Sequence, residues 1–149
     1  DAEVPDNVNG VIFAMGGYAG GVSLYAVDGE LRYDYSALLL KRYQIKVGEL
    51  PAGKVKIAYE MRTPLERAAP AELKFWINGK EAASGTVGRT IPLTFTASET
   101  FDVGRDTCSP VADDYYDKAP FAFEGTLTEL HFKNLLDEKP AFKRSPDDD

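Results

Sequence analysis

Short stretches in which apolar and polar residues alternate recur along most of the chain. Alternation with a period of two places successive side chains on opposite faces of an extended backbone, so each stretch is typical of a half-buried β-strand. Residues 54–62 and 72–77 show the pattern most clearly. Their apolar positions are Val55, Ile57, Tyr59 and Met61 in the first stretch, and Leu73, Phe75 and Ile77 in the second.

Two dipeptides between such stretches predict tight hairpin turns. Asp28-Gly29 separates residues 22–27 from residues 31–35, and Asn78-Gly79 separates residues 72–77 from residues 80–87. The favoured two-residue turn needs positive φ at both central positions, which Asn, Asp and Gly adopt most easily. We therefore expect two antiparallel strand pairs at these positions.

Further strands are expected at residues 11–15, 38–47, 92–96, 101–103 and 121–132. The last of these needs a bulge between Leu127 and Leu130 to keep its apolar residues on one face. Residues 104–120 are predicted to form a long polar loop. About ten short strands without a convincing helix predict an all-β fold, namely a two-sheet antiparallel sandwich of jelly-roll type. We expect a single domain over residues 1–149, ordered from about residue 10 to 133, with an acidic tail at residues 145–149.

Composition narrows the classes of partner. The 149 residues are 44% hydrophobic and 11% aromatic, which is enough to build a core, and the formal net charge is −7. A binding face for nucleic acid or for an anionic membrane needs excess basic charge, so neither partner is expected. Cys108 is the single cysteine, so no internal disulfide forms, and periplasmic, secreted and cytoplasmic locations all stay open. The start of the chain lacks an initiator Met, and we expect it to be a piece of a longer protein.

Several segments, taken in order, point to a known family. They are GVIFAMGG at residues 10–17, GGVSLY at 20–25, LPAGK at 50–54, DVGRDT at 102–107, APF at 119–121 and FEGTL at 123–127. Over roughly residues 10–133 this series resembles the C-terminal concanavalin-like (laminin-G-like) domain of large bacterial arylsulfatases. The DVGRDT block is the most specific of the segments. Cys108 departs from the pattern, because the family is expected to have Gly there.

The resemblance implies an accessory domain without chemistry of its own. Its parent would be a sulfuric ester hydrolase, and its partner the sulfatase catalytic domain of the same chain or subunit, so that the domain supports the catalytic domain or a subunit interface. Sulfatases carry a Cys/Ser-x-Pro-x-Arg signature. The sequence Cys-Ser-Pro-Val-Ala that starts at Cys108 does not end in the required Arg. Any sulfatase chemistry therefore belongs upstream of Asp1.

Few residues are candidates for chemistry in this chain. His131 is the single histidine, and it lies between Leu130 and Phe132 on the predicted last strand, where it points away from the core. A nucleophile–base pair would have to use it, and we interpret it as a surface residue. Aspartates crowd residues 102–117, and Asp106, Asp113 and Asp114 are the candidate ligands for Ca²⁺, which prefers carboxylate oxygens. The other interpretation is loop order through Asx turns and a salt bridge to Arg105. No cofactor is otherwise expected.

Three aromatic residues are candidates for recognition. Trp76 is predicted on the polar face of its strand, and Tyr115 and Tyr116 lie in the acidic loop. Exposed aromatic rings stack on sugars or dock onto other domains. The alternative function is therefore a lectin-like carbohydrate-binding module, with Ca²⁺ as its candidate cofactor. A third hypothesis, a jelly-roll glycoside hydrolase, needs paired carboxylates such as Glu60 and Glu72, which no motif selects.

Overall fold

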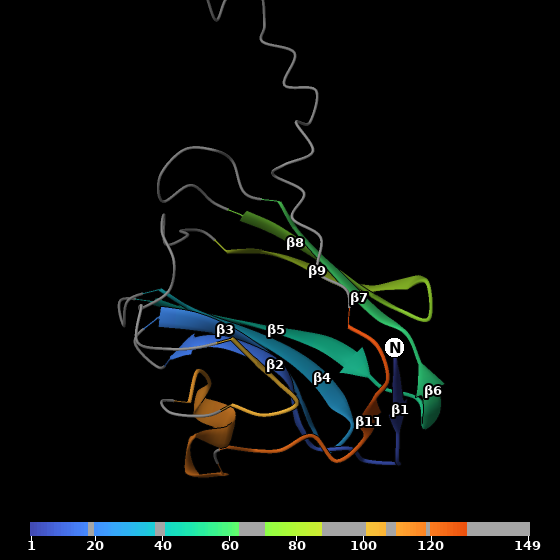
Figure 1. Ribbon diagram of the computed structural model, residues 1–149. Helices are drawn as coiled ribbons and strands as arrows, with labels where there is room; N and C mark the ends of the chain where they lie inside the picture. Colours follow the sequence, from blue (N-terminus) through green and yellow to red (C-terminus); the bar gives the residue numbers. More distant parts are fainter. Residues whose placement is uncertain are drawn as a thin grey trace, which may run out of the picture.

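The computed structural model describes residues 1–17, 20–37, 41–62, 71–87, 101–106, 110–118 and 120–130. Most of these residues are in antiparallel strands, and the strands form an all-β sandwich (Figure 1). The predicted fold class is confirmed at this level. The helical structure in these ranges is one 3-10 helix, η1 (Asp113–Lys118). In the described part of the chain, no helix is long and apolar enough to cross a membrane.

One layer of the sandwich is a five-stranded antiparallel sheet. Its strand order is β10-β2-β3-β4-β5, so four strands follow one another in the chain and β10 is added at the β2 edge. Short connections favour pairing between strands that follow one another in the chain. The strands are β2 (Gly10–Gly17), β3 (Gly20–Val27), β4 (Glu30–Ala37), β5 (Lys41–Glu49) and β10 (Phe101–Val103).

Two three-stranded sheets complete the sandwich. Strands β7 (Ile57–Arg62), β8 (Ala71–Ile77) and β9 (Lys80–Val87) form one of them, which lies above the five-stranded sheet in Figure 1. The other has the order β11-β1-β6. Its strands are β1 (Ala2–Val4), β6 (Gly53–Val55) and β11 (Thr126–Leu127).

Both predicted hairpin turns are present. Asp28 and Gly29 have φ of 49° and 82°, and Asn78 and Gly79 have φ of 52° and 80°. These values match the turn whose twist suits a two-residue hairpin. Strands β3 and β4 therefore pair in register from Val27↔Glu30 onward, and β8 and β9 pair from Ile77↔Lys80 onward.

The alternating stretch at residues 54–62 is two strands rather than one. β6 pairs with β1, whereas β7 pairs with β8 in another sheet, and the change occurs at Lys56. There the backbone N–H of Lys56 donates to Asn78 Oδ1 at 2.9 Å, and the N–H of Asn78 donates to the Lys56 carbonyl at 2.8 Å. The side chain of a hairpin residue thus satisfies the backbone at the point where the chain leaves one sheet for the next.

The two ends of the chain differ from the sequence-based expectation. Strand β1 precedes residue 10, where order was expected to begin. At the other end, the strand expected at residues 121–132 is reduced, within the described residues, to the pair Thr126–Leu127 of β11. Phe121 has φ of 46°, a value that a strand residue does not adopt, and the pairing next to it is a single isolated bridge between Ala122 and Val11. The expected strand at 92–96, Cys108, His131 and the acidic tail lie outside the described residues.

The core between the layers is built from the alternating apolar positions. Leu31, Tyr33 and Tyr35 of β4 face inward together, as their spacing predicts, and Leu73 and Phe75 of β8 meet them from the other layer. The ring of Tyr33 lies 5.3 Å from that of Phe75. Burying each of these side chains contributes on the order of 1.5–3 kcal/mol. This interior accounts for the two-layer arrangement.

A second, smaller core lies on the outer face of the five-stranded sheet. Residues 110–118, here called the strap, include η1 and cover that face, as Figure 1 shows in orange below the sheet. Tyr115 of the strap is fully buried against Tyr25 of β3, with ring centroids 5.0 Å apart. The remaining members of this core are Val11, Ala14, Val111 and Ala112, with Val27 and Phe121 packed against them. The molecule therefore has a third, partial layer.

Candidate functional site

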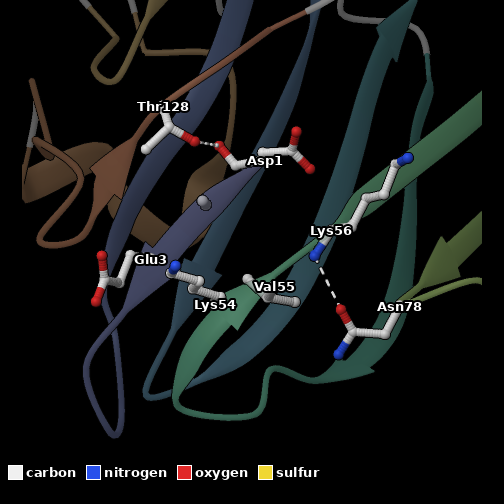
Figure 2. Close-up of a pocket in the computed structure, with 8 residues that line it drawn as sticks. Asp1, Glu3, Lys54, Val55, Lys56, Asn78 and Thr128 are labelled. Atoms are coloured by element: carbon white, nitrogen blue, oxygen red, sulfur yellow. Dashed lines mark hydrogen bonds between the residues drawn. The ribbon is translucent and has the colours of Figure 1, made fainter.

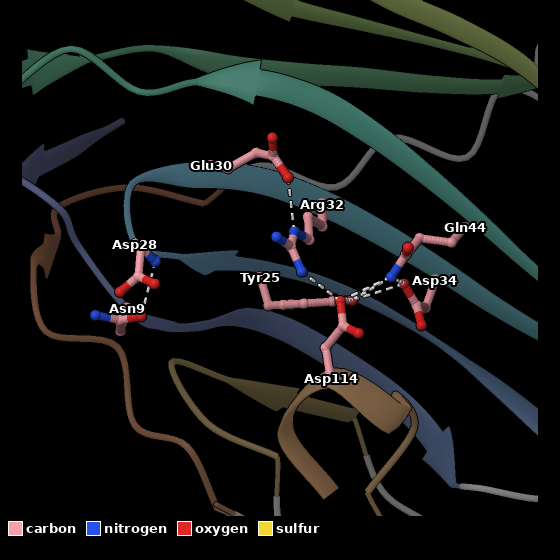
Figure 3. Close-up of polar contacts among 8 residues, drawn as sticks. All are labelled: Asn9, Tyr25, Asp28, Glu30, Arg32, Asp34, Gln44 and Asp114. Atoms are coloured by element: carbon pink, nitrogen blue, oxygen red, sulfur yellow. Dashed lines mark hydrogen bonds and ion pairs between the residues drawn. The ribbon is translucent and has the colours of Figure 1, made fainter.

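A cluster of polar side chains lies between the strap and the outer face of the five-stranded sheet (Figure 3). Strand alternation directs Tyr25 of β3, Arg32 and Asp34 of β4, and Gln44 of β5 to this face, because their neighbours in sequence fill the inner core. Asp114 of the strap enters the cluster from the opposite side. Three consecutive strands and the strap, whose Asp114 lies 70 positions after Gln44, thus contribute to one polar site.

Asp114 accepts three hydrogen bonds through a single carboxylate oxygen, Oδ2. The donors are Arg32 Nη1 at 2.7 Å, Gln44 Nε2 at 2.8 Å and the Tyr25 hydroxyl at 2.9 Å. Arg32 is itself fixed by a second ion pair, between its Nε and Glu30 Oε1 at 2.8 Å. Charge-assisted hydrogen bonds of this kind are stronger than those between neutral groups. Asp114 is therefore the residue that joins the strap to β3, β4 and β5.

The second carboxylate of the cluster, Asp34, lies deeper. Its side chain is almost inaccessible, with 5% of the residue exposed. Asp34 Oδ1 is 2.7 Å from the Tyr25 hydroxyl oxygen and 3.1 Å from Gln44 Nε2. The same hydroxyl and the same amide therefore contact both carboxylates.

The pKa values of the two carboxyl groups are shifted in opposite directions. Burial raises the pKa of Asp34 above its ordinary value, and hydrogen bonds from Tyr25 and Gln44 offset this only in part. Partial burial also opposes ionisation of Asp114, but the hydrogen bonds from Arg32, Tyr25 and Gln44 outweigh it and hold its pKa below the ordinary value. Burial, followed by the neighbouring Asp34 and Asp114 carboxyl groups, raises the pKa of the Tyr25 hydroxyl, which keeps its proton.

A second polar group fastens the strap on the β2 side of the cluster. The Tyr115 hydroxyl contacts Ser23 Oγ at 2.9 Å and makes a short hydrogen bond to Asp106 Oδ2. The same Asp106 oxygen accepts from the backbone N–H of Val111 at 2.8 Å. Burial and the adjacent Asp106 charge raise the pKa of the Tyr115 hydroxyl. Asp106 is 1% exposed, so this group is entirely internal.

The predicted metal ligands do not converge on one point. Asp106 faces Tyr115 and Val111, Asp114 faces Arg32, and Asp113 Oδ2 lies 3.8 Å from Arg42 Nε. Within the described residues, no group of three or more His, Cys, Asp or Glu side chains is placed to hold a metal ion. These aspartates instead connect the strap to the sheet through protein donors.

The three predicted recognition aromatics are in three different environments. Tyr115 is fully buried, so its ring is not available to a sugar or to a partner. Tyr116, the next residue, is 52% exposed on the strap. Trp76 is half-buried on the outer face of β8, in register with Ala58 of β7. Because the inner core separates β8 from the strap side, Trp76 and Tyr116 lie on opposite sides of the sandwich and cannot form one site.

A shallow cavity of about 400 Å³ lies away from this cluster, at β1, β6 and the Asn78 turn (Figure 2). Its lining has charges of both signs, and neither Glu60 nor Glu72 is part of it. In the strand register, Glu60 is opposite Lys74 and Glu72 is opposite Arg62. The residues of this lining are Asp1, Ala2, Glu3, Lys54, Val55, Lys56, Asn78 and Thr128.

The residues that build the cluster were mostly missed from the sequence. Arg32 and Asp34 share a strand face by alternation, and this was the available signal, but nothing local connects them with Asp114, about eighty residues later. The fold and the cluster define the class of the protein as an antiparallel β-sandwich with a strapped outer sheet face. No protein-family profile matches the chain, and comparisons with curated proteins and with solved structures gave no match.

Proposed function

We propose that the chain is a non-catalytic accessory domain of a larger enzyme of the arylsulfatase type, in which it supports the catalytic domain or a subunit interface. The ordered series of segments that ends with DVGRDT and FEGTL supports the sulfatase parent. The all-β sandwich is compatible with a concanavalin-like, jelly-roll arrangement. Function lives in sites rather than in folds, and the polar cluster is the site that bears on this proposal.

The observation that carries the proposal is how the carboxylates of the cluster are used. General acid–base or nucleophilic chemistry needs a group that reaches substrate in an accessible cleft. Asp34 and Asp106 are buried and bonded to tyrosine hydroxyls, and Asp114 is bonded to Arg32. The cavity at β1, β6 and the Asn78 turn is lined by none of them. The cluster therefore serves to hold the strap in place.

Two aromatic residues mark alternative docking faces. Tyr116 is exposed on a strap that its neighbours Asp114 and Tyr115 fasten to the sheet, so its backbone is held in place without a partner. Preorganised aromatic anchors give contact energy at low entropic cost. Trp76 offers the second face, on the outer side of β8.

The first test concerns the parent protein. We expect the coding sequence upstream of Asp1 to contain a Cys/Ser-x-Pro-x-Arg signature. Hydrogen exchange is then compared between the full-length parent protein and the isolated 149-residue chain. We expect protection of either the strap face or the outer β7–β9 face only when the upstream part is present. Equal exchange of both faces in the two proteins would contradict a supporting role.

The second test concerns activity of this chain alone. We expect the purified chain to turn over neither p-nitrophenyl sulfate nor chromogenic glycosides. Turnover that survives Asp34→Asn and Asp114→Asn but is lost with Glu60→Gln or Glu72→Gln would instead establish the jelly-roll hydrolase. In the parent, Tyr116→Ala and Trp76→Ala form a matched pair, and the variant that lowers subunit association or thermal stability identifies the docking face.

The alternative function, a carbohydrate-binding module, has one supporting observation. Trp76 lies on a sheet face next to Ala58, a small residue that leaves the ring approachable. Calorimetric titration of the isolated chain with neutral and sulfated oligosaccharides, with and without Ca²⁺, tests it. Binding that is lost in Trp76→Ala and retained in Tyr116→Ala would favour this function over docking. A rise in Tm with Ca²⁺ that Asp106→Ala abolishes would establish the metal.

A further inference from the structure

The hydroxyl of Tyr25 contacts two carboxylates but carries a single hydrogen. Its oxygen lies 2.7 Å from Asp34 Oδ1 and 2.9 Å from Asp114 Oδ2, and both separations are hydrogen-bond distances. Tyrosine donates one hydrogen bond, whereas ionised carboxylates only accept. If both aspartates were ionised, one of these contacts would have no hydrogen between its two oxygen atoms and would be repulsive.

Gln44 does not supply the missing hydrogen. Its amide nitrogen lies 2.8 Å from Asp114 Oδ2, 3.1 Å from Asp34 Oδ1 and 3.1 Å from the Tyr25 oxygen. Gln44 has two N–H groups for these three acceptors, and both hydrogens are bonded to its nitrogen, so neither lies between the Tyr25 oxygen and a carboxylate oxygen. The count of donors therefore calls for one further proton within the pair of aspartates.

The surroundings decide which aspartate carries that proton. Asp34 is 5% exposed and has neutral partners, whereas Asp114 has 28% of its side chain exposed and is 2.7 Å from the Arg32 guanidinium. A charge is more costly in the less exposed position, and an adjacent cation favours the ionised form. Both effects place the proton on Asp34 and the negative charge on Asp114.

We propose that Asp34 and Asp114 share one proton, carried by Asp34, in the state that fastens the strap, so that Asp34 donates to the Tyr25 oxygen and Tyr25 donates to Asp114. The strap is then a proton-linked latch. When Asp34 loses its proton, two carboxylates compete for the single Tyr25 hydrogen and the hold on Asp114 weakens. When Asp114 gains a proton, its ion pair with Arg32 is lost.

The charged groups around the pair come from every element packed against it. On β4, Arg32 lies between Asp114 and Glu30. On β5, Arg42 favours ionised Asp34, but its guanidinium is bonded to the Val111 carbonyl at 2.6 Å. Further charged or titratable groups on these elements are Lys46 on β5, Asp113 and Tyr115 on the strap, and Asp106 beside Tyr115. Arg32 thus neutralises Asp114 directly, and no comparable cation is bonded to Asp34 among the contacts of the described residues.

The pH dependence follows with a definite sign. The pKa of Asp34 is raised on folding, so between the ordinary aspartate pKa of about 4 and the raised value the folded state binds more protons, and stability falls as pH rises. The pKa of Asp114 is lowered, so its contribution is present above about pH 4 and is lost as pH falls through the lowered value. The strap should be held most tightly between the lowered pKa of Asp114 and the raised pKa of Asp34.

The test uses the intact chain. Carbon-13 NMR of the Asp34 carboxyl group in wild-type protein reports its titration directly, and we expect a midpoint above about 4, the ordinary aspartate value. Hydrogen exchange at the Val11 amide, which donates to the Phe121 carbonyl at 2.8 Å, reports opening of the strap region. After correction for intrinsic exchange, we expect wild-type protection at this amide to decrease as pH rises from about 4 to the Asp34 midpoint, and to level off above it.

Asp34→Asn and Asp114→Asn are the matched pair of variants. An Asn at position 34 retains a donor toward Tyr25 without titrating, so we expect protection within about threefold of wild type and without the decrease at higher pH. Asp114→Asn removes the charge opposite Arg32, and we expect protection to fall about tenfold or more. An Asp34 midpoint at or below the ordinary value in the wild type would overturn the proposal, whatever the variants do.

Discussion

The interior between the two layers and the layer beneath the strap are built by different physics. The interior is apolar and aromatic, with Phe13, Tyr33, Tyr59 and Phe75 forming a chain of ring contacts 5.3–5.7 Å apart. The strap layer has a small apolar core, and polar groups fasten it: Asp114 to Arg32, Gln44 and Tyr25, and Tyr115 to Ser23 and Asp106.

The difference separates what stabilises the fold from what sets one conformation of a loop. Apolar burial is non-directional and proportional to area, so the interior provides most of the folding free energy. Hydrogen bonds and ion pairs contribute less in net terms, but their geometry is specific and an unsatisfied partner is costly. We therefore expect damage to the interior to unfold the sandwich, and damage to the strap layer to release a segment from a sandwich that remains folded.

The largest effect is expected from Phe75→Ala in the interior. Phe75 is fully buried against Tyr33 and Tyr59, and its removal leaves a cavity between the two layers. The free energy of unfolding should fall by about 3–5 kcal/mol. Urea unfolding followed by circular dichroism measures it, with Trp76→Ala on the outer face of the same strand as the control. A loss in Phe75→Ala no larger than that in Trp76→Ala would contradict the assignment of the core.

The next effect tests the junction between the two regions at Gly10. This residue has φ of +119°, and a Cβ atom built there would lie 2.3 Å from the Ala122 carbonyl oxygen. We expect Gly10→Ala to lower the free energy of unfolding by roughly 2–4 kcal/mol through backbone strain and overlap. Gly53→Ala is the control, because Gly53 has φ of +96° with nothing within 4 Å. Equal losses in the two variants would show that the close approach is unimportant.

A smaller effect is expected from Tyr115→Phe beneath the strap. The change removes a hydroxyl from Ser23 and from buried Asp106 while it keeps the ring against Tyr25. We expect a loss of about 1–3 kcal/mol, because Asp106 loses a donor in a site that water does not reach. Tyr116→Phe, on the adjacent exposed residue, should stay within about 0.5 kcal/mol of wild type. Thermal unfolding measures the loss of stability in the two variants. A larger loss in Tyr116→Phe than in Tyr115→Phe would contradict the placement of the strap.

The smallest effect is expected from Arg32→Gln. Arg32 is partly exposed and makes ion pairs with Asp114 and Glu30, so its loss should cost about 1 kcal/mol at neutral pH and less at high salt. The pKa of Asp114 should rise toward its ordinary value. The Asp114 contribution would then be lost at a higher pH than in wild type as the solution is acidified. Lys46→Gln, at the register partner of Arg32 on β5, is the control. If Arg32→Gln lost stability at the same acidic pH as the wild type, Arg32 would not be what lowers the pKa of Asp114.

Much of the strand architecture was predictable because its causes are local. Alternation in Leu31, Tyr33 and Tyr35 identified their inward face, and Asp28-Gly29 and Asn78-Gly79 identified both hairpins. The division at Lys56 was not predictable, because alternation continues through it while the pairing partner changes from β1 to β8. A strand's pattern records its burial, and the identity of its neighbour is decided elsewhere in the chain.

By itself, then, the sequence determined the fold class, the hairpins and the inward faces, since these depend on backbone sterics and on the period of apolar residues. Only the tertiary structure decided the strap and its polar cluster, because the hydrogen bonds between the strap and the sheet join residues 69 to 92 positions apart. Tyr115 and Tyr116 show why. They are adjacent residues of the same type, yet Tyr115 is fully buried and Tyr116 is 52% exposed. No local pattern distinguishes them, because the sheet residues that Tyr115 packs against and bonds to include Tyr25 and Ser23, the latter 92 positions away.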